Sequence, residues 1–483
     1  MIKTKLTKKG YGILKSELTE EQIKYHTKRL TFTPNTQNVS LPFPVKPKPI
    51  PCYRFAPNYM WVPRVYGIET FGNPETCNNE GKEININFEG TLREKQAEMF
   101  ELGKNKIDSL GGGIFALHCG FGKTALALYF VAHYSQKTLW IVHKTFLMNQ
   151  AKEAIQKFLP GAKIGTLQRD TIDIENKDIV IGMLQSISMK DYPKEIFKEF
   201  GMVVIDECHH ISSEKFSQAL WKVSSKYMIG LSATPDRKDG LSRIFEMSIG
   251  PIVCEIKNTV RKPNIEFIHS HIFETEPCPV YHNGKTALPQ MINTVCDSFD
   301  RTKVILDRIG ELVKEQGRCI LLISDRRNHL DVFYNFIPKW FPGTSVGYYV
   351  GGMKQSDLEE SSKKQVILGT YAMSSEGLDI PALNTLILAS PKSDVEQSVG
   401  RILRKDHPGL EPLVIDLVDH WGPFENQYYK RRRFYRKMEY KILEDSALVT
   451  KKTKKKTLDL SSTNNLKSNK PPTGFESFFI KKK

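Results

Sequence analysis

Two series of short apolar segments, each alternating with helical patterns, constrain the fold of this chain more than any other feature. The first series comprises GIFALHC (113–119), TLWIVH (138–143), DIVIGML (178–184), MVVIDE (202–207) and MIGLSAT (228–234). The second comprises CILLIS (319–324), SVGYYV (345–350), QVILGT (365–370), TLILAS (385–390) and PLVIDLV (412–418). Continuous apolar strands separated by helices are typical of buried parallel sheets. The sequence therefore predicts an α/β fold with two tandem parallel-sheet domains and a cleft between them.

The composition outside these series predicts the rest of the organisation. Residues 16–30 have an amphipathic helical pattern, residues 58–72 suggest short strands, and five prolines in residues 41–51 predict an extended linker. We expect four parts: an N-terminal accessory region (1–85), a first α/β domain (86–258), a second α/β domain (259–425) and a basic, largely disordered tail (426–483).

The net charge of +16 is concentrated at the two ends of the chain. Residues 421–483 hold 17 Lys and Arg against 6 Asp and Glu, and residues 1–60 hold 11 against 3, whereas the middle has a net charge of −3. A near-neutral body with basic ends predicts a polyanionic partner, although either end alone also suits solvated surface.

The cysteines and the hydropathy pattern bear on the compartment. Eight scattered cysteines without a CxxC pair indicate an intracellular, reducing compartment. The chain has no apolar stretch of membrane-spanning length and no secretory signal at its start, so we expect no membrane partner.

The segment LHCGFGKT (117–124) links a predicted strand to a helical pattern and predicts a phosphate-binding P-loop. Backbone N–H groups of a glycine-rich turn at a helix N-terminus cradle phosphates. Lys123 is expected to reach the β- and γ-phosphates and Thr124 to hold Mg²⁺, although Leu117 replaces the usual first glycine. The predicted nucleotide-contacting residues of this loop are Cys119, Gly120, Phe121, Gly122, Lys123 and Thr124.

Two adjacent acids, Asp206 and Glu207, end the apolar segment MVVIDE. Open α/β sheets bind ligands at the carboxyl ends of their strands. Because phosphoryl transfer needs a carboxylate for the metal and a group that orients the attacking water, we assign these roles to Asp206 and Glu207 respectively. His209 is expected to relay changes towards the second domain.

Further polar residues surround this predicted site. Ser232 and Thr234 of LSATP end the next strand and are expected to hydrogen-bond the acidic site. Arg93 and Gln96 of TLREKQ precede the P-loop, and the planar donor and acceptor of a glutamine amide suit an adenine edge.

The order of the motifs LREKQ, GFGKT, DECH, SAT, EGLD (376–379) and QSVGRILR (397–404) resembles that of superfamily 2 helicases over about residues 88–420. The chain is most similar to the xeroderma-pigmentosum-B type and to relatives from large DNA viruses and phages, including poxvirus transcript-release helicases. The resemblance implies two RecA-like domains with an ATP cleft between them. It also implies ATP and Mg²⁺ as cofactors, nucleic-acid-stimulated ATP hydrolysis and 3′→5′ polarity.

The resemblance also assigns roles in the second domain. It implies that Gly377 and Asp379 contact phosphate or ribose, and that Gln397, Arg401 and Arg404 form the final motif, with both arginines facing the γ-phosphate. The spacing of these last three residues predicts one shared helix face. Arginines that reach across a cleft neutralise charge developing on the transferred phosphoryl group, so hydrolysis is expected to require domain closure.

Candidate nucleic-acid contacts stand after predicted strand ends and in the GGMK loop. Such polar and basic groups contact phosphates without reading sequence. The residues are Lys144, Thr145, Gln185, Ser186, Arg326, Arg327 and Lys354.

The predicted function is an ATP-dependent nucleic-acid helicase or translocase in viral-type transcription, replication or repair, with DNA favoured over RNA. Two alternatives stay open. One is a double-strand translocase or transcript-release factor that does not separate strands. The other is a nucleotide-gated scaffold without turnover, which the presence of Glu207, Arg401 and Arg404 disfavours.

The C-terminal segment PPTGFESFFIKKK carries Phe475, Phe478 and Phe479 at i, i+3 and i+4 spacing, which places three rings on one side of a helical turn. This segment resembles the sliding-clamp-binding peptide, although Pro472 stands where a glutamine is usual. We therefore expect a clamp partner, and the alternative is that the rings pack back onto the body of the protein.

Overall fold

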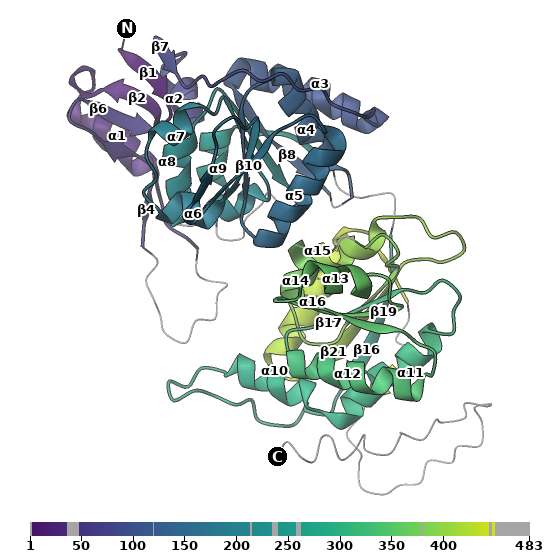
Figure 1. Ribbon diagram of the computed structural model, residues 1–483. Coiled ribbons are helices and arrows are strands. Elements are labelled where there is room, and N and C mark those ends of the chain that lie inside the picture. The colour runs from purple at the N-terminus through teal and green to yellow at the C-terminus, as the bar shows by residue number, and fades with distance from the viewer. Residues whose placement is uncertain are drawn as a thin grey trace, which may run out of the picture. The chain divides into compact units, whose positions relative to one another are not determined.

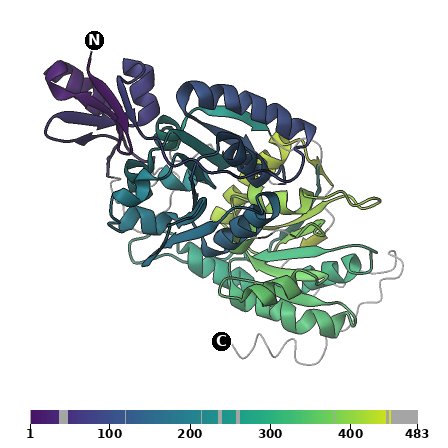
Figure 2. The same cartoon turned by 45° about the horizontal axis from the view of Figure 1, so that its top comes forward.

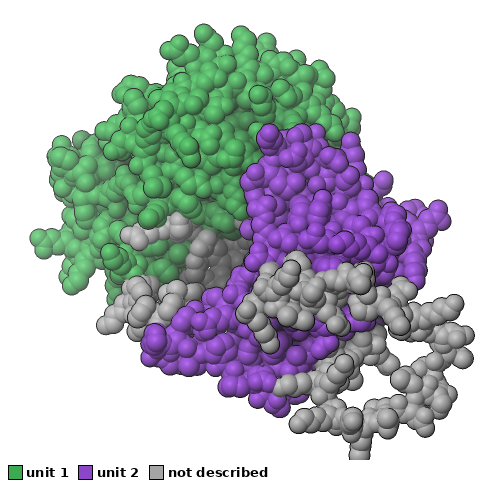
Figure 3. All heavy atoms as spheres, turned by 60° about the horizontal axis from the view of Figure 1, so that its bottom comes forward, with its two compact units in different colours: residues 1–257 green, residues 258–483 purple. Residues whose placement is uncertain are grey.

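The computed structural model describes residues 2–35, 48–118, 120–212, 215–233, 240–256, 262–376, 378, 380–443 and 447–449. The chain divides into two compact units, residues 1–257 and residues 258–483 (Figure 3). Among the described residues, no helix is both long enough and apolar enough to cross a lipid bilayer.

A five-stranded sheet with the strand order β5-β6-β2-β1-β7 forms the N-terminal part of the first unit (Figure 1). Its region contains β1 (Thr4–Thr7), β2 (Gly10–Leu14), α1 (Glu20–Arg29), β3 (Thr31–Phe32), β4 (Ile50–Pro51), β5 (Arg54–Phe55), β6 (Tyr59–Val62), α2 (Arg64–Phe71), β7 (Thr76–Asn78) and a 3-10 helix (Lys15–Glu17). Helix α1 lies within the segment 16–30 whose amphipathic pattern predicts a helix, and it begins with a capping box between Thr19 and Gln22. The expectation of strands throughout 58–72 is wrong, because Pro63 ends β6 and starts α2.

The rest of the first unit is an eight-stranded sheet with the order β11-β10-β12-β9-β13-β14-β8-β15. All neighbours are parallel except β10 and β11. Its strands are β8 (Gly112–Leu117), β9 (Thr138–Val142), β10 (Ile164–Gln168), β11 (Thr171–Asp173), β12 (Ile179–Met183), β13 (Met202–Ile205), β14 (Tyr227–Ser232) and β15 (Ile252–Ile256). Its helices are α3 (Glu94–Leu110), α4 (Lys123–Tyr134), α5 (Thr145–Phe158), α6 (Leu184–Met189), α7 (Glu195–Lys198), α8 (Leu220–Val223), α9 (Ser242–Ile249) and two 3-10 helices (Cys208–Ser212 and Phe216–Ala219).

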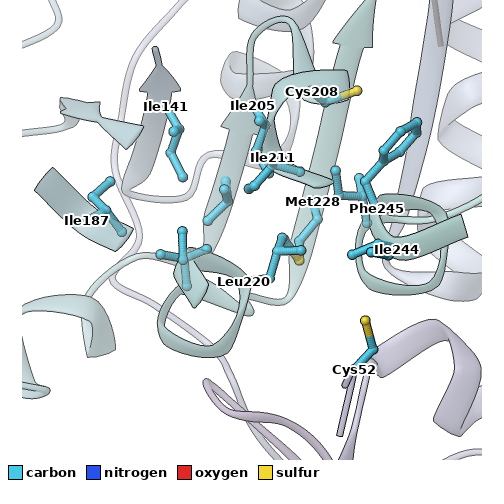
Figure 4. Packing of buried hydrophobic residues seen from close by; sticks show 14 of the residues in the cluster. Cys52, Ile141, Ile187, Ile205, Cys208, Ile211, Leu220, Met228, Ile244 and Phe245 are labelled. Atoms are coloured by element: carbon cyan, nitrogen blue, oxygen red, sulfur yellow. The ribbon is translucent and has the colours of Figure 1, made fainter. Parts of the chain in front are cut away.

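The N-terminal part packs against α9 through α2, and its apolar residues belong to one hydrophobic cluster with those beneath the larger sheet (Figures 2 and 4). Cys52 from the N-terminal part lies beside Leu220 and Ile244 at a small cavity on this boundary. The buried Arg64 guanidinium donates to the carbonyl oxygens of Leu110, Gly111, Ser225 and Lys226 at 2.9–3.2 Å, and burial lowers the pKa of Arg64 to about 10. The predicted accessory region is therefore part of the first unit and not a separate compact body.

The second unit is also built on a parallel sheet, with the order β18-β19-β17-β20-β21-β16-β22 and β23 beside β16. Its strands are β16 (Asn264–Ser270), β17 (Ile320–Ser324), β18 (Val346–Tyr349), β19 (Val366–Thr370), β20 (Thr385–Leu388), β21 (Leu413–Asp419), β22 (Lys441–Ile442) and β23 (Ala447–Val449). Its helices are α10 (Leu288–Cys296), α11 (Phe299–Leu312), α12 (Arg327–Trp340), α13 (Gln355–Ser361), α14 (Tyr371–Glu376), α15 (Glu396–Val399), a 3-10 helix (Gly400–Leu403) and α16 (Pro423–Lys437). Separate apolar clusters cover the two faces of this sheet, which explains why its strands read as continuous apolar runs.

The prediction of a disordered tail from residue 426 is wrong for the first part of that segment. Helix α16 buries Phe424, Tyr428, Arg431 and Tyr435, and β22 pairs with β16. Arg431 and Asp416 form a buried ion pair at 2.7 Å. The charge of this helix is thus partly neutralised within the fold.

Candidate nucleotide and nucleic-acid sites

The P-loop joins β8 to α4 at the carboxyl end of the first unit's parallel sheet. Gly120 and Gly122 have φ angles of +82° and +90°, which favour glycine. A Cβ atom at Gly122 would lie 2.5 Å from the Gln96 amide nitrogen, so a substitution would displace that amide as well as strain the backbone. Thr124 lies in the first turn of α4, where free backbone N–H groups attract anions. Cys119 lies outside the described residues.

Arg93 and Gln96 hold the P-loop from the start of α3. Gln96 Nε2 donates to the carbonyl oxygens of Phe121 and Gly122, each at 3.2 Å, and Gln96 Oε1 accepts from the Arg93 backbone N–H at 3.0 Å. The Arg93 guanidinium also donates to the Phe121 carbonyl. Because the buried amide uses both hydrogens on the loop, Gln96 shapes the P-loop; adenine reading by Gln96 stays a prediction.

The acidic pair follows β13, between β9 and β14 in the sheet. Lys123 Nζ lies 3.9 Å from Glu207 Oε1 and donates to the Leu117 carbonyl at 3.3 Å. Burial and the charge of Glu207 raise the pKa of Asp206 to about 6, against the opposing charge of Lys123. Two acids beside one lysine leave an excess of negative charge in a part-buried place. The site therefore fits Mg²⁺, which prefers oxygen ligands, and Asp206 with the Thr124 hydroxyl would hold it.

The rings of His209, His210 and His143 form a row of contacts that begins at Glu207, called the histidine series below. His209 Nδ1 lies 2.9 Å from Ser232 Oγ and 3.5 Å from Glu207 Oε2. The His210 ring lies 4.3 Å from the His209 ring and 4.0 Å from the His143 ring, measured between centroids. The structure thus places Ser232 beside His209, next to the acidic pair. Thr234 lies outside the described residues.

The histidine series ends at the first group of candidate nucleic-acid residues. Gln185 Nε2 donates to the backbone carbonyl of His143 at 2.6 Å, and Lys144 is the next residue along the chain. Because β9 and β12 are neighbours, the start of α5 with Lys144 and Thr145 meets the start of α6 with Gln185 and Ser186. Both pairs are at least partly exposed.

The sequence predicted roles for His209 at one end of the histidine series and for Gln185 at the other, but not for the two histidines between them. His210 directly follows His209, and His143 directly precedes Lys144, so each is the neighbour of a residue with a predicted role. Only the ring contacts in the folded chain distinguish them from ordinary polar neighbours.

Three basic candidates lie after strand ends of the second unit. Arg326 follows β17, and its guanidinium donates to Asn293 Oδ1 at 2.5 Å and to the Pro289 carbonyl at 3.1 Å, which ties it to α10. Arg327 and Lys354 are exposed, at the starts of α12 and α13. Arg327 and Lys354 therefore present open charge, while Arg326 supports a neighbouring helix.

The final motif differs from its expected geometry. Helix α15 ends at Val399, and a tighter 3-10 helix continues through Leu403, so Gln397, Arg401 and Arg404 do not share one α-helical face. Arg401 is buried, and its guanidinium donates to the carbonyl oxygens of Ser374 at 2.6 Å and Leu378 at 3.0 Å. Arg401 thus fixes the segment around the EGLD motif.

Arg404 is part-buried beside Tyr349. Burial raises the pKa of Tyr349, and the charges of Arg401 and Arg404 oppose that rise. Gly377 and Asp379, and the C-terminal residues Phe475, Phe478 and Phe479, lie outside the described residues. Their roles, including the clamp contact, stay predictions.

These features define a P-loop nucleotide-binding protein with two parallel α/β units. Residues 89–237 match the family described as "Type III restriction enzyme, res subunit", and residues 302–406 match "Helicase conserved C-terminal domain". A protein of Acanthamoeba polyphaga mimivirus, named as an ATP-dependent RNA helicase, is 37% identical over 454 residues, which cover 91% of this chain and 86% of the relative.

More distant relatives extend the same pattern. A protein of African swine fever virus, also named as an ATP-dependent RNA helicase, is 25% identical over 390 residues, covering 75% of this chain and 76% of the relative. A helicase-named protein of invertebrate iridescent virus 6 is 28% identical over 380 residues, covering 74% of this chain and 84% of the relative. The chain belongs to the superfamily 2 helicases and is an ATP-dependent helicase.

Proposed function

We propose that the chain couples ATP hydrolysis in the first unit to movement along a nucleic-acid strand that contacts Lys144, Thr145, Gln185 and Ser186. The observation that carries this proposal is the continuous series of contacts from Glu207 through His209, His210 and His143 to Gln185. A series of packed polar groups is a physical means by which a change at the nucleotide alters the strand-binding loops, and the reverse.

The residues of the first unit divide the chemistry among them. Lys123 would leave Glu207 for the β- and γ-phosphates when a nucleotide binds, which frees the Glu207 carboxylate to orient the attacking water. Asp206 and the Thr124 hydroxyl would hold Mg²⁺, which supplies positive charge to the phosphate oxygens. The shift of Glu207 would reach Ser232 through His209.

The second unit would complete the site when the two units close. Arg401, through its bonds to the carbonyls of Ser374 and Leu378, would position the segment that carries Gly377 and Asp379. Arg404 would then supply the charge that neutralises the transferred phosphoryl group, with Gln397 beside it in the same motif.

The preference for DNA and the 3′→5′ direction belong to the proposal and rest on the resemblance to xeroderma-pigmentosum-B-like helicases. RNA is the competing substrate, because the mimivirus and African swine fever virus relatives are named RNA helicases. The described cysteines are free thiols, which supports an intracellular, reducing compartment.

The test is the ATPase rate of the full chain with single-stranded DNA, duplex DNA and RNA side by side, in the wild type and in Glu207→Gln. We expect single-stranded DNA to stimulate wild-type turnover most, and the variant to bind ATP and nucleic acid while losing hydrolysis. Glu153→Gln, on the exposed face of α5, is the matched control. Near-normal turnover in Glu207→Gln contradicts its assigned role, and greatest stimulation by RNA overturns the DNA preference.

A further inference from the structure

The strands β16 and β21 are parallel neighbours in the sheet of the second unit (Figure 1). Three histidines meet at the carboxyl ends of these two strands. His269 lies near the end of β16, His271 follows that strand, and His420 follows β21. The backbone N–H of His420 donates to the Ser270 carbonyl at 2.9 Å, which fixes the two strand ends against each other. One ligand atom from each histidine lies within 4.8 Å of the others. We propose that this cluster binds a divalent transition-metal ion of the zinc class.

The surroundings of the rings match the chemistry of a histidine metal site. His271 Nδ1 lies 3.0 Å from Glu274 Oε2, and His420 Nδ1 lies 3.3 Å from Glu425 Oε1. Metal-binding histidines commonly donate their second ring N–H to a carboxylate, which fixes the tautomer and raises the basicity of the other nitrogen. When Nδ1 of His271 and Nδ1 of His420 carry the ring protons, Nε2 of each ring has a lone pair that can bind a metal ion.

His269 supplies the third nitrogen that can bind the metal ion. His269 Nδ1 lies 2.6 Å from His420 Nε2, so one nitrogen donates the single proton between them to the other. A metal ion would displace that proton, which moves to His269 Nε2 and keeps this ring neutral, and the ion would bind both facing nitrogens. Histidine nitrogens around tetrahedral zinc lie about 2.0–2.1 Å from the metal and therefore about 3.3 Å apart. The rings are stacked in this structure: His271 and His420 lie 4.2 Å apart between centroids with planes at 5°, and His269 and His420 lie 4.9 Å apart with planes at 22°. Because the lone pairs lie in the ring planes, the rings must turn out of this stack for all three nitrogens to face one ion.

Burial and ligand type favour such an ion. His269 is buried, while His271 and His420 are partly exposed, which leaves a route from solvent. Imidazole suits zinc, nickel, copper and iron, whereas Mg²⁺ prefers oxygen. The magnesium that serves the nucleotide would therefore not compete for this site.

A metal here would fasten a segment that has few other anchors in regular structure. Residues 271–287 leave β16 and lead to α10, which packs against Trp421 and Phe424. The Trp421 indole donates to the Glu276 carbonyl at 2.9 Å. Helix α10 in turn holds the Arg326 guanidinium through Asn293. The ion would link the ends of β16 and β21. It would thereby stabilise the segment that leads to α10, the helix that binds the Arg326 guanidinium.

The experiment uses the full chain, freed of metal by a chelator and then kept in excess Mg²⁺. Co²⁺ is titrated and followed by its visible d–d absorption, and Zn²⁺ is then added as competitor. We expect one equivalent of Co²⁺ to bind, Zn²⁺ to displace it, and Zn²⁺ to raise the thermal unfolding midpoint. His271→Ala/His420→Ala should abolish binding, and Glu425→Gln should raise the Kd about 10–100-fold, in line with other carboxylates that support metal-binding histidines.

His282→Ala is the matched control, because His282 is an exposed histidine of the same segment. Cys77→Ser, which removes an exposed free thiol, controls for binding by cysteine. Both controls should keep one full equivalent of Co²⁺. The absence of stoichiometric binding in the wild type, or its persistence in His271→Ala/His420→Ala, would overturn the proposal. If the double variant fails to fold, an unchanged Kd for Co²⁺ in the milder Glu425→Gln variant would overturn the proposal.

Discussion

Replacing Gln96 by Met tests whether this residue shapes the P-loop or reads the base. Methionine has a similar length and volume but cannot donate to the Phe121 and Gly122 carbonyls, as the amide does at 3.2 Å. A net contribution of about 1 kcal/mol for each hydrogen bond gives a loss of about 2 kcal/mol. If nucleotide binding must then supply the ordering of the loop, the Kd rises about 30-fold, because 1.4 kcal/mol corresponds to a factor of ten.

The assay is calorimetric titration with non-hydrolysable analogues of ATP and GTP. Since the loop cradles phosphates and both amide hydrogens are used by the loop, we expect the two Kd values to rise by the same factor. Glu101→Met, an exposed position on the same helix, should leave both unchanged. A loss confined to the ATP analogue would refute the loop argument and assign Gln96 to the adenine edge.

Three further outcomes are expected. Gly103→Ala should destabilise the first unit by about 1–3 kcal/mol in urea unfolding, because the added Cβ would lie 2.3 Å from a core phenylalanine ring, whereas Gly161→Ala meets nothing within 4 Å and should be neutral. Asp416→Asn should destabilise the second unit by about 3–5 kcal/mol, since it leaves the buried Arg431 charge uncompensated; a cost below about 1 kcal/mol would contradict this. His143→Gln should lower the stimulation of ATP hydrolysis by nucleic acid about fivefold or more, while the basal rate stays unchanged. Undiminished stimulation would show that His143 does not couple the nucleotide site to the strand-binding loops.

All ten apolar segments form strands. Nine of these strands are buried almost throughout, because burial on both sides demands apolar residues at every position, whereas β18 is buried only at Gly347. β16 was missed because Glu266 and His269 interrupt its apolar pattern. Both are buried, and Glu266 is satisfied by Arg308 at 2.8 Å, a partner on α11 that no local pattern reveals.

The candidate site also has parts that local sequence predicts and parts that depend on contacts between distant residues. The P-loop and the acids Asp206 and Glu207 were predictable because short local segments carry their chemistry. The contact between Gln185 and His143 joins positions 42 residues apart, so only the folded sheet brings them together. The shape of the final motif also depends on distant groups, since Arg401 donates to carbonyls of Ser374 and Leu378.

The structure changes how the basic C-terminal end must be tested. Removing residues 426–483 would delete most of α16, including Arg431 and Tyr435, which both hydrogen-bond the buried Asp416. Loss of nucleic-acid binding in that variant would report the unfolding of the second unit. Truncation after residue 450 avoids this, because α16, β22 and β23 all end before that point.

Residues 451–483 still carry 10 lysines against 2 acids, a net charge of +8. If these lysines neutralise phosphates, truncation after residue 450 should weaken binding to duplex DNA and flatten its salt dependence by about 0.9 in logarithmic slope for each phosphate that is no longer neutralised. The matched control is the same length of tail with its lysines replaced by glutamines, which should behave like the truncation. An unchanged slope in both variants would show that the charge that engages nucleic acid lies in the folded units, at residues such as Lys144 and Lys354.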